Sequence, residues 1–177
     1  DLFFIGRIAK MKNLIFTLEA LKVCSFKIKF TIYGPIDDFS YWQKCKKIIN
    51  DLPKNIIVVY KGSVVNSDIE NIIKKHNFFI SSTFGENFGH SIAESLANST
   101  PVVISDKTPW QSLHKFNAGW NFSLNNKKQL VELLIKLNEM KQCEYKTTQN
   151  SSLNYYIDKH EDLYKKHIIT YYKLFNV

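Results

Sequence analysis

The stretch that decides the fold is residues 78–104, which read FFISSTFGENFGHSIAESLANSTPVVI. It begins with a short apolar run that predicts a buried strand at Phe78–Ser81. Apolar residues then recur at a spacing of four and predict a helix near Phe88–Ala97, and a further apolar run predicts a strand at Val102–Ile104. A strand, a loop, a helix and a second strand in this order are typical of a parallel sheet covered by helices.

The same alternation of short apolar runs and helical stretches continues on both sides of this segment. Further strands are predicted at Leu2–Ile5, Phe30–Tyr33, Ile56–Tyr60 and Trp120–Phe122. Further helices are predicted over residues 14–21 and near Tyr41–Ile49, Asp68–Lys75, Trp110–Lys115 and Lys127–Met140. We therefore expect an α/β fold, a doubly wound Rossmann-like parallel sheet of about six strands with helices on both faces, plus C-terminal helices.

The chain divides into three parts by composition. Its 177 residues fit one domain of ordinary size, and we expect the sheet domain to span residues 1–140. Residues 141–152 are polar and are predicted to be a linker, and residues 153–177 are predicted to form a C-terminal helical segment. The chain opens on an apolar strand without an initiator Met, so we expect a piece of a longer protein.

The C-terminal segment allows two interpretations. Its lysines are compatible with a helix on a membrane surface, whereas its apolar side chains favour packing against another domain, which is the preferred interpretation. These side chains are Leu153, Tyr156, Ile157, Tyr164, Ile168, Tyr172 and Phe175.

The composition is that of a globular protein with a basic surface. Hydrophobic residues make up 45% of the chain, and the formal net charge is +8. A positive charge favours anionic partners such as phosphorylated small molecules, although a lysine-rich solvated surface is the preferred explanation. The three cysteines form no C-x-x-C pair, and no apolar run is long enough to cross a membrane. We expect a cytoplasmic protein, with peripheral contact to the inner face of a membrane as an alternative.

Glycines mark one edge of the predicted sheet. Gly6, Gly34 and Gly62 each follow a predicted strand, and Gly85 and Gly89 bracket the loop after the fourth strand. Open α/β sheets bind ligands at the carboxyl ends of their strands, where glycine lets the backbone turn and approach a ligand closely. Glycine can also simply end a strand, so this pattern locates a candidate site without naming its ligand.

Two acidic residues flank the predicted start of the helix that follows the fourth strand. Glu86 lies in the loop, and Glu94 lies within the helix, so both carboxylates can face one cleft. The helix start between them supplies free backbone N–H groups and the positive end of the helix dipole, which suit an anion. This arrangement fits a ligand that combines phosphates with hydroxyl-bearing rings, because carboxylates accept hydrogen bonds from hydroxyls.

These residues resemble the carboxyl-terminal domain of the retaining glycosyltransferases of family four, which have two Rossmann-like domains. The family signature is E-x7-E with F-G after the first glutamate and a P-V-V strand beyond the second. Here it corresponds to Glu86, Phe88-Gly89, Glu94 and Pro101-Val102-Val103. The family's G-R-x4-K element corresponds to Gly6-Arg7 through Lys12, and its later strand-end glycines correspond to Gly34 and Gly62.

The resemblance implies roles for these residues in binding and transferring a sugar from a nucleotide. Arg7 and Lys12 would neutralise the diphosphate, and Glu86 would lie beside the transferred sugar; these three are the expected catalytic residues. Glu94 would accept hydrogen bonds from the ribose. The remaining expected donor-binding residues are Gly6, Gly34, Lys61, Gly62, Asn87, Phe88, Gly89 and His90.

The resemblance also implies the partners of this domain. A nucleotide-diphosphate sugar would be a substrate, with no cofactor and no metal, and the protein's own N-terminal domain would bind the acceptor. We therefore expect this fragment to be inactive alone.

Two alternative functions remain beside the glycosyltransferase: the chain could be half of a sugar-nucleotide epimerase, or a non-catalytic nucleotide-binding module. A nucleic-acid partner is not expected, because the aromatic residues fall mostly in predicted strands and helices. A dinucleotide-binding oxidoreductase is disfavoured, because no G-x-G-x-x-G follows a strand.

Overall fold

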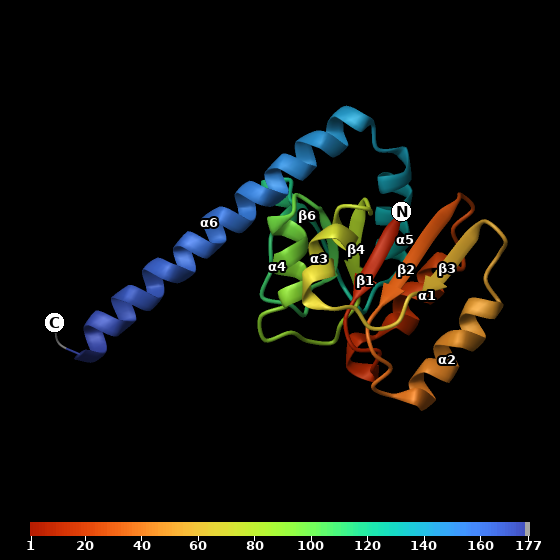
Figure 1. Cartoon of the computed structure of the whole chain (residues 1–177). Coiled ribbons are helices and arrows are strands. Elements are labelled where there is room, and N and C mark those ends of the chain that lie inside the picture. Colours follow the sequence, from red (N-terminus) through yellow and green to blue (C-terminus); the bar gives the residue numbers. More distant parts are fainter. Residues whose placement is uncertain (176–177) are drawn as a thin grey trace.

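The computed structural model describes the backbone of residues 1–175 and the side chains of residues 1–159. Its centre is a parallel sheet of six strands in the order β3-β2-β1-β4-β5-β6 (Figure 1). The strands are β1 (Leu2–Ile5), β2 (Ile28–Tyr33), β3 (Ile56–Tyr60), β4 (Phe78–Ser81), β5 (Val102–Ser105) and β6 (Gly119–Phe122). The predicted fold class is confirmed, and the six strands lie within two residues of their predicted bounds.

Helices cover both faces of this sheet. The α-helices are α1 (Leu14–Leu21), α2 (Phe39–Asn50), α3 (Asn66–Ile73), α4 (His90–Ala97), α5 (Lys127–Glu139) and α6 (Gln142–Phe175). Two short 3-10 helices are η1 (Lys10–Lys12) and η2 (Leu113–Phe116). Helices α1, α2 and α5 pack on one face, whereas α3, α4 and Tyr155 of α6 pack on the other.

The alternation of side chains along β1 explains the two cores. Successive residues of a strand point to opposite faces, so a buried central strand is apolar throughout. Leu2 and Phe4 join the core beneath α1, α2 and α5, while Phe3 and Ile5 join the core beneath α3 and α4. All four residues of β1 are buried, as expected for the middle of a sheet that is covered on both sides.

The strand order reverses between β1 and β4. From β1 the chain builds outward through β2 to β3 with α1 and α2 on one face, then crosses through α3 on the other face to β4. At such a reversal the loops that leave the two neighbouring strands diverge, and a crevice opens at the carboxyl edge of the sheet.

Gly34 holds the carboxyl ends of β1, β2 and β3 together. Its φ of +132° is a conformation that other residues rarely adopt, and a Cβ atom there would lie 1.9 Å from the carbonyl oxygen of Gly6. Its N–H donates to the carbonyl oxygen of Gly62 over 2.7 Å. The glycine at this position is therefore required for close packing of three strand ends.

The predicted linker is instead helical. Helix α6 begins at Gln142 and runs through residues 142–152, and its carboxyl-terminal half extends away from the sheet (Figure 1). Thr148 and Ser152 are buried in this stretch, and the hydroxyl of Ser152 donates to the carbonyl oxygen of Ala118 over 3.0 Å. Small hydroxyl residues whose hydrogen bonds are satisfied cover the domain here, so the buried face of the helix carries no apolar pattern.

Two further predictions concern the helix after β5 and the C-terminal segment. The helix expected near Trp110–Lys115 is reduced to the short η2, and Trp110 lies in the loop before it. In the C-terminal segment, the side chains of Tyr164, Ile168, Tyr172 and Phe175 lie outside the described residues. No helix of the described part of the chain is long and apolar enough to cross a membrane.

Candidate functional site

A cavity of about 810 Å³ opens at the carboxyl edge of the sheet, where the strand order reverses. Its walls are the end of β1, the loop of residues 7–13 (the Lys12 loop), the loop of residues 84–89 (the Glu86 loop) and the start of α4. Eight of the predicted site residues line it: Gly6, Arg7, Lys12, Glu86, Asn87, Phe88, Gly89 and His90. The crevice expected from the topology is thus built largely from the residues that the sequence motif singles out.

Lys12 and Glu86 form an ion pair inside this cavity. The Lys12 Nζ lies 2.6 Å from the Glu86 Oε1, and the two side chains are 21% and 16% exposed. Partial burial excludes much of the solvent that weakens ion pairs on a protein surface. The pair places a cation and an anion side by side, and a bound phosphate would compete with Glu86 for the lysine.

Buried hydroxyl groups hold the two loops together. The Ser82 Oγ donates to the carbonyl oxygen of Asn13 over 2.6 Å and shares a hydrogen bond of 2.9 Å with the Thr17 Oγ1. The backbone N–H of Phe84 donates to the carbonyl oxygen of Met11 over 2.9 Å. Lys12 is therefore positioned against Glu86 by bonds on either side of it.

Arg7 lies at the same cavity but is held much less firmly. Its Nη1 is 3.5 Å from the Asp37 Oδ2, and the two side chains are 69% and 48% exposed. Exposed pairs with such long contacts contribute little energy. Arg7 can therefore turn toward an anionic ligand at small cost, whereas Lys12 is already in place.

The start of α4 forms another part of the cavity wall. Gly89 is the N-cap residue with φ +80°, and no side chain caps the helix. The N–H groups of a first helical turn have no partner within the helix, and together with the dipole they suit a phosphate. Next to this turn, the Nε1 of Trp110 donates to the carbonyl oxygen of Phe88.

Glu94 lies one turn into α4, beyond the residues that line the cavity. Burial raises the pKa of its carboxyl group, and the nearby His90 acts in the opposite direction. Among residues 1–159, no cation forms an ion pair with Glu94. A half-buried carboxylate without a cation is suited to accept hydrogen bonds from ligand hydroxyls.

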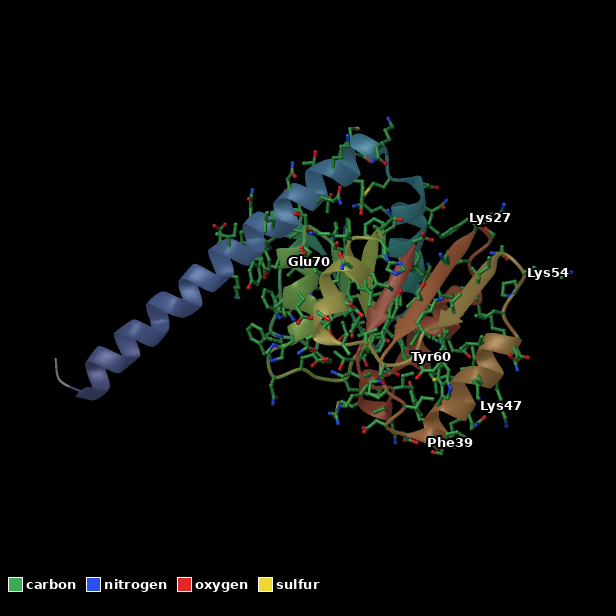
Figure 2. All side chains as sticks on the ribbon, viewed as in Figure 1. Lys27, Phe39, Lys47, Lys54, Tyr60 and Glu70 are labelled. Carbon is green, nitrogen blue, oxygen red and sulfur yellow. The ribbon has the colours of Figure 1, made fainter. Side chains whose placement is uncertain are left out.

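The β2–β3 side of the edge does not line the cavity. Gly34, Lys61 and Gly62 are absent from its walls, and Lys61 is exposed. Tyr60 ends β3 near this point (Figure 2), and its hydroxyl donates to the carbonyl oxygen of Gly34 over 2.9 Å. Tyr60 and Gly34 thus hold the ends of β2 and β3 together beside the cavity.

Several residues of this site belong to no motif in the sequence. Ser82, directly after β4, bonds to Thr17 of α1, Trp110 supports the Glu86 loop, and Lys107 adds a further cation to the cavity. The Thr-Pro-Trp sequence at residues 108–110, three residues after the end of β5, is the signal that was available for Trp110. Within the described residues, no three His, Cys, Asp or Glu side chains gather as metal ligands.

Comparison with known proteins shows the family of this chain. Residues 1–154 match the family model of the group 1 glycosyl transferases. The poly(glycerol-phosphate) alpha-glucosyltransferase of Bacillus subtilis (strain 168) is 38% identical over 105 residues, which are 58% of this chain and 15% of that protein. The chain therefore spans less than a sixth of the length of that relative.

Solved structures show the same fold. Anabaena Alr3699/HepE, in complex with UDP and glucose, has a TM-score of 0.75 at 17% identity over 88% of this chain and 42% of that one. The C-terminal domain of the group 1 glycosyl transferase LpcC from Francisella tularensis has a TM-score of 0.71 at 16% identity, over 90% of this chain and 85% of that one. The chain belongs to the group 1 glycosyl transferases.

Proposed function

We propose that this chain binds a nucleoside-diphosphate sugar in the cavity between β1 and β4, as the donor-binding half of a glycosyltransferase. The observation that carries the proposal is that the Lys12–Glu86 pair and the uncapped start of α4 line one cavity. A cation and free N–H groups suit a diphosphate, and a carboxylate in the same cavity suits the hydroxyls of a sugar.

Donor binding would rearrange the ion pair. The diphosphate would accept hydrogen bonds from Lys12 and from the backbone N–H groups of Asn87 to His90, and Arg7 would turn in from the exposed rim. Glu86, released from Lys12, would accept hydrogen bonds from the sugar, and Glu94 would accept them from the ribose. As the sugar leaves, the charge on the diphosphate increases, so the same cations stabilise the transition state more than the ground state.

UDP-glucose is the first donor to test. The Bacillus subtilis relative is named as an alpha-glucosyltransferase, and Anabaena HepE has been solved with UDP-glucose. UDP-glucose carries an α-linked sugar, so an α-glucoside product corresponds to retention at the anomeric carbon. Because Lys12, Arg7 and Lys107 supply positive charge to the cavity, the reaction is proposed to need no metal or other cofactor.

The acceptor would bind outside the described residues, on an N-terminal domain of the full-length protein. Residues 1–140 would then be the donor domain, α6 would connect it to the rest of the enzyme, and this fragment alone would transfer no sugar. The reaction would take place in the cytoplasm, with peripheral membrane contact through basic surface residues.

Calorimetric titration of the chain with UDP, GDP, ADP and UDP-glucose tests the proposal. We expect one nucleoside diphosphate to bind at one site, with weaker binding of the matching monophosphate. Failure of all of these ligands to bind would contradict it. In the full-length enzyme, NMR of the product separates transfer from epimerisation, since an epimerase changes the donor without an acceptor.

A further inference from the structure

The Glu86 loop is supported from behind by one indole ring. Trp110 is 3% exposed, and its Nε1 donates to the carbonyl oxygen of Phe88. Its ring meets the ring of Phe88 edge to face at a centroid distance of 5.7 Å. A Cβ atom on Gly89 would lie 3.4 Å from the same indole nitrogen, so the ring is also in close contact with the N-cap of α4.

Trp110 is itself held from three directions. The Asn121 Nδ2 donates to its carbonyl oxygen over 2.8 Å, and its own N–H donates to the Thr108 Oγ1 over 3.3 Å. On its far side lies Tyr155 of α6, with ring centroids 6.2 Å apart, and the Tyr155 hydroxyl donates to the carbonyl oxygen of Gln111 over 3.0 Å. The indole is therefore a fixed support for the loop.

We propose that Trp110 is a positioning residue for the donor: its indole N–H fixes the Phe88 carbonyl, so that the backbone N–H groups that follow face the diphosphate. The inference rests on the proposed function of the cavity. Trp110 does not line the cavity, so it acts through the backbone of the Glu86 loop. Preorganised donors bind an anion more tightly, because their ordering cost is met before the ligand arrives.

Helix α6 contacts the segment that carries Trp110. Tyr155 holds the turn that carries Trp110, and Ser152 and Thr148 bind the neighbouring segment at Ala118 and Asn117. Helix α6 thus supports the Glu86 loop through Trp110, although no described residue of α6 lines the cavity. Loosening this contact is expected to weaken donor binding without removing any group that touches the ligand.

The test compares Trp110→Phe with Trp120→Phe in the whole chain, with UDP as the probe. Both variants exchange a buried indole for phenyl, but Trp120 packs against Phe78 in the core on the other face of the sheet. We expect Trp110→Phe to weaken UDP affinity about fivefold and Trp120→Phe to leave it unchanged, even where both lower the melting temperature. Equal affinities for wild type and Trp110→Phe would overturn the inference.

Amide hydrogen exchange gives a readout that needs no ligand. We expect faster exchange at residues 88–91 in Trp110→Phe and unchanged exchange in β1 and β4. If the wild-type chain binds none of UDP, GDP, ADP and UDP-glucose, the proposed function fails, whereas amide exchange in the loop still tests the role of Trp110. If Trp110→Phe does not fold, the wild-type chain supplies the test: a Trp110 indole proton that exchanges as fast as a free indole contradicts the inference.

Discussion

The carboxyl edge of the sheet has two halves that look alike in sequence and differ in structure. Both carry a glycine after a strand and a lysine nearby. At the β1–β4 half, Lys12 is 21% exposed and paired with Glu86 in a cavity; at the β2–β3 half, Lys61 is exposed and lies outside it. A strand-end glycine alone therefore does not make a site. The reversal of strand order, which opens a crevice beside β1, makes the difference.

The largest expected effect concerns the structural half of this edge. Gly34→Ala places a Cβ atom 1.9 Å from the Gly6 carbonyl oxygen at a φ that alanine rarely adopts. We expect a loss of about 3 kcal/mol or more in the free energy of unfolding, and a melting temperature lower by about 10 °C. Gly85→Ala is the control, because its Cβ would meet no atom within 4 Å. Similar losses in both variants would show that the close approach of the strands is not essential.

Lys12→Met is expected to weaken nucleoside diphosphate binding about thirtyfold. It removes a cation from the cavity wall, and hydrogen bonds to charged groups contribute about 1.5–3 kcal/mol. Arg7→Met, at an exposed position with a 3.5 Å ion pair, should cost about threefold. Calorimetry of both variants compares the two losses of affinity. A larger loss of affinity for Arg7→Met would show that Arg7, and not Lys12, is the principal phosphate ligand.

Glu94→Gln is expected to lower affinity about tenfold and to stabilise the unliganded chain at neutral pH. Burial raises the folded-state pKa of Glu94, so its protonated form is favoured on folding, and that stability is lost as the pH rises through the folded-state pKa. The melting temperature of the variant should therefore exceed that of wild type at pH 7, and the difference should vanish well below the pKa of an ordinary glutamate. A variant less stable than wild type at pH 7 would contradict this account of Glu94.

Lys61→Ala is expected to have the smallest effect, a change of less than about twofold in nucleoside diphosphate affinity. The side chain is exposed and outside the cavity. A loss as large as that of Lys12→Met would show that the ligand extends over β3, where the family resemblance implies donor-binding residues.

Local patterns were sufficient to predict the sheet and most of the cavity. Buried parallel strands are short apolar runs, so β1, β3 and β4 are visible in the sequence, and the Glu86 and Lys12 loops carry a motif. Contacts between distant segments were not predictable in this way. The Ser82–Thr17 bond and the Trp110–Phe88 bond join segments 65 and 22 residues apart, and neither leaves a periodic signal.

The start of α6 was missed for a related physical reason. Its buried face uses Thr148 and Ser152, whose hydroxyls find carbonyl partners, so a stretch that is packed on the domain has the composition of a linker. Burial that is satisfied by hydrogen bonds is not detectable from hydropathy.

The most direct test of the central claim is a map of amide chemical-shift changes when UDP is added to the isotopically labelled chain. The account predicts that the largest changes fall on residues 86–91 and on Gly6 to Lys12, with small changes at Lys61 and Gly62. Changes centred on the β2–β3 half of the edge, with the start of α4 unaffected, would contradict it.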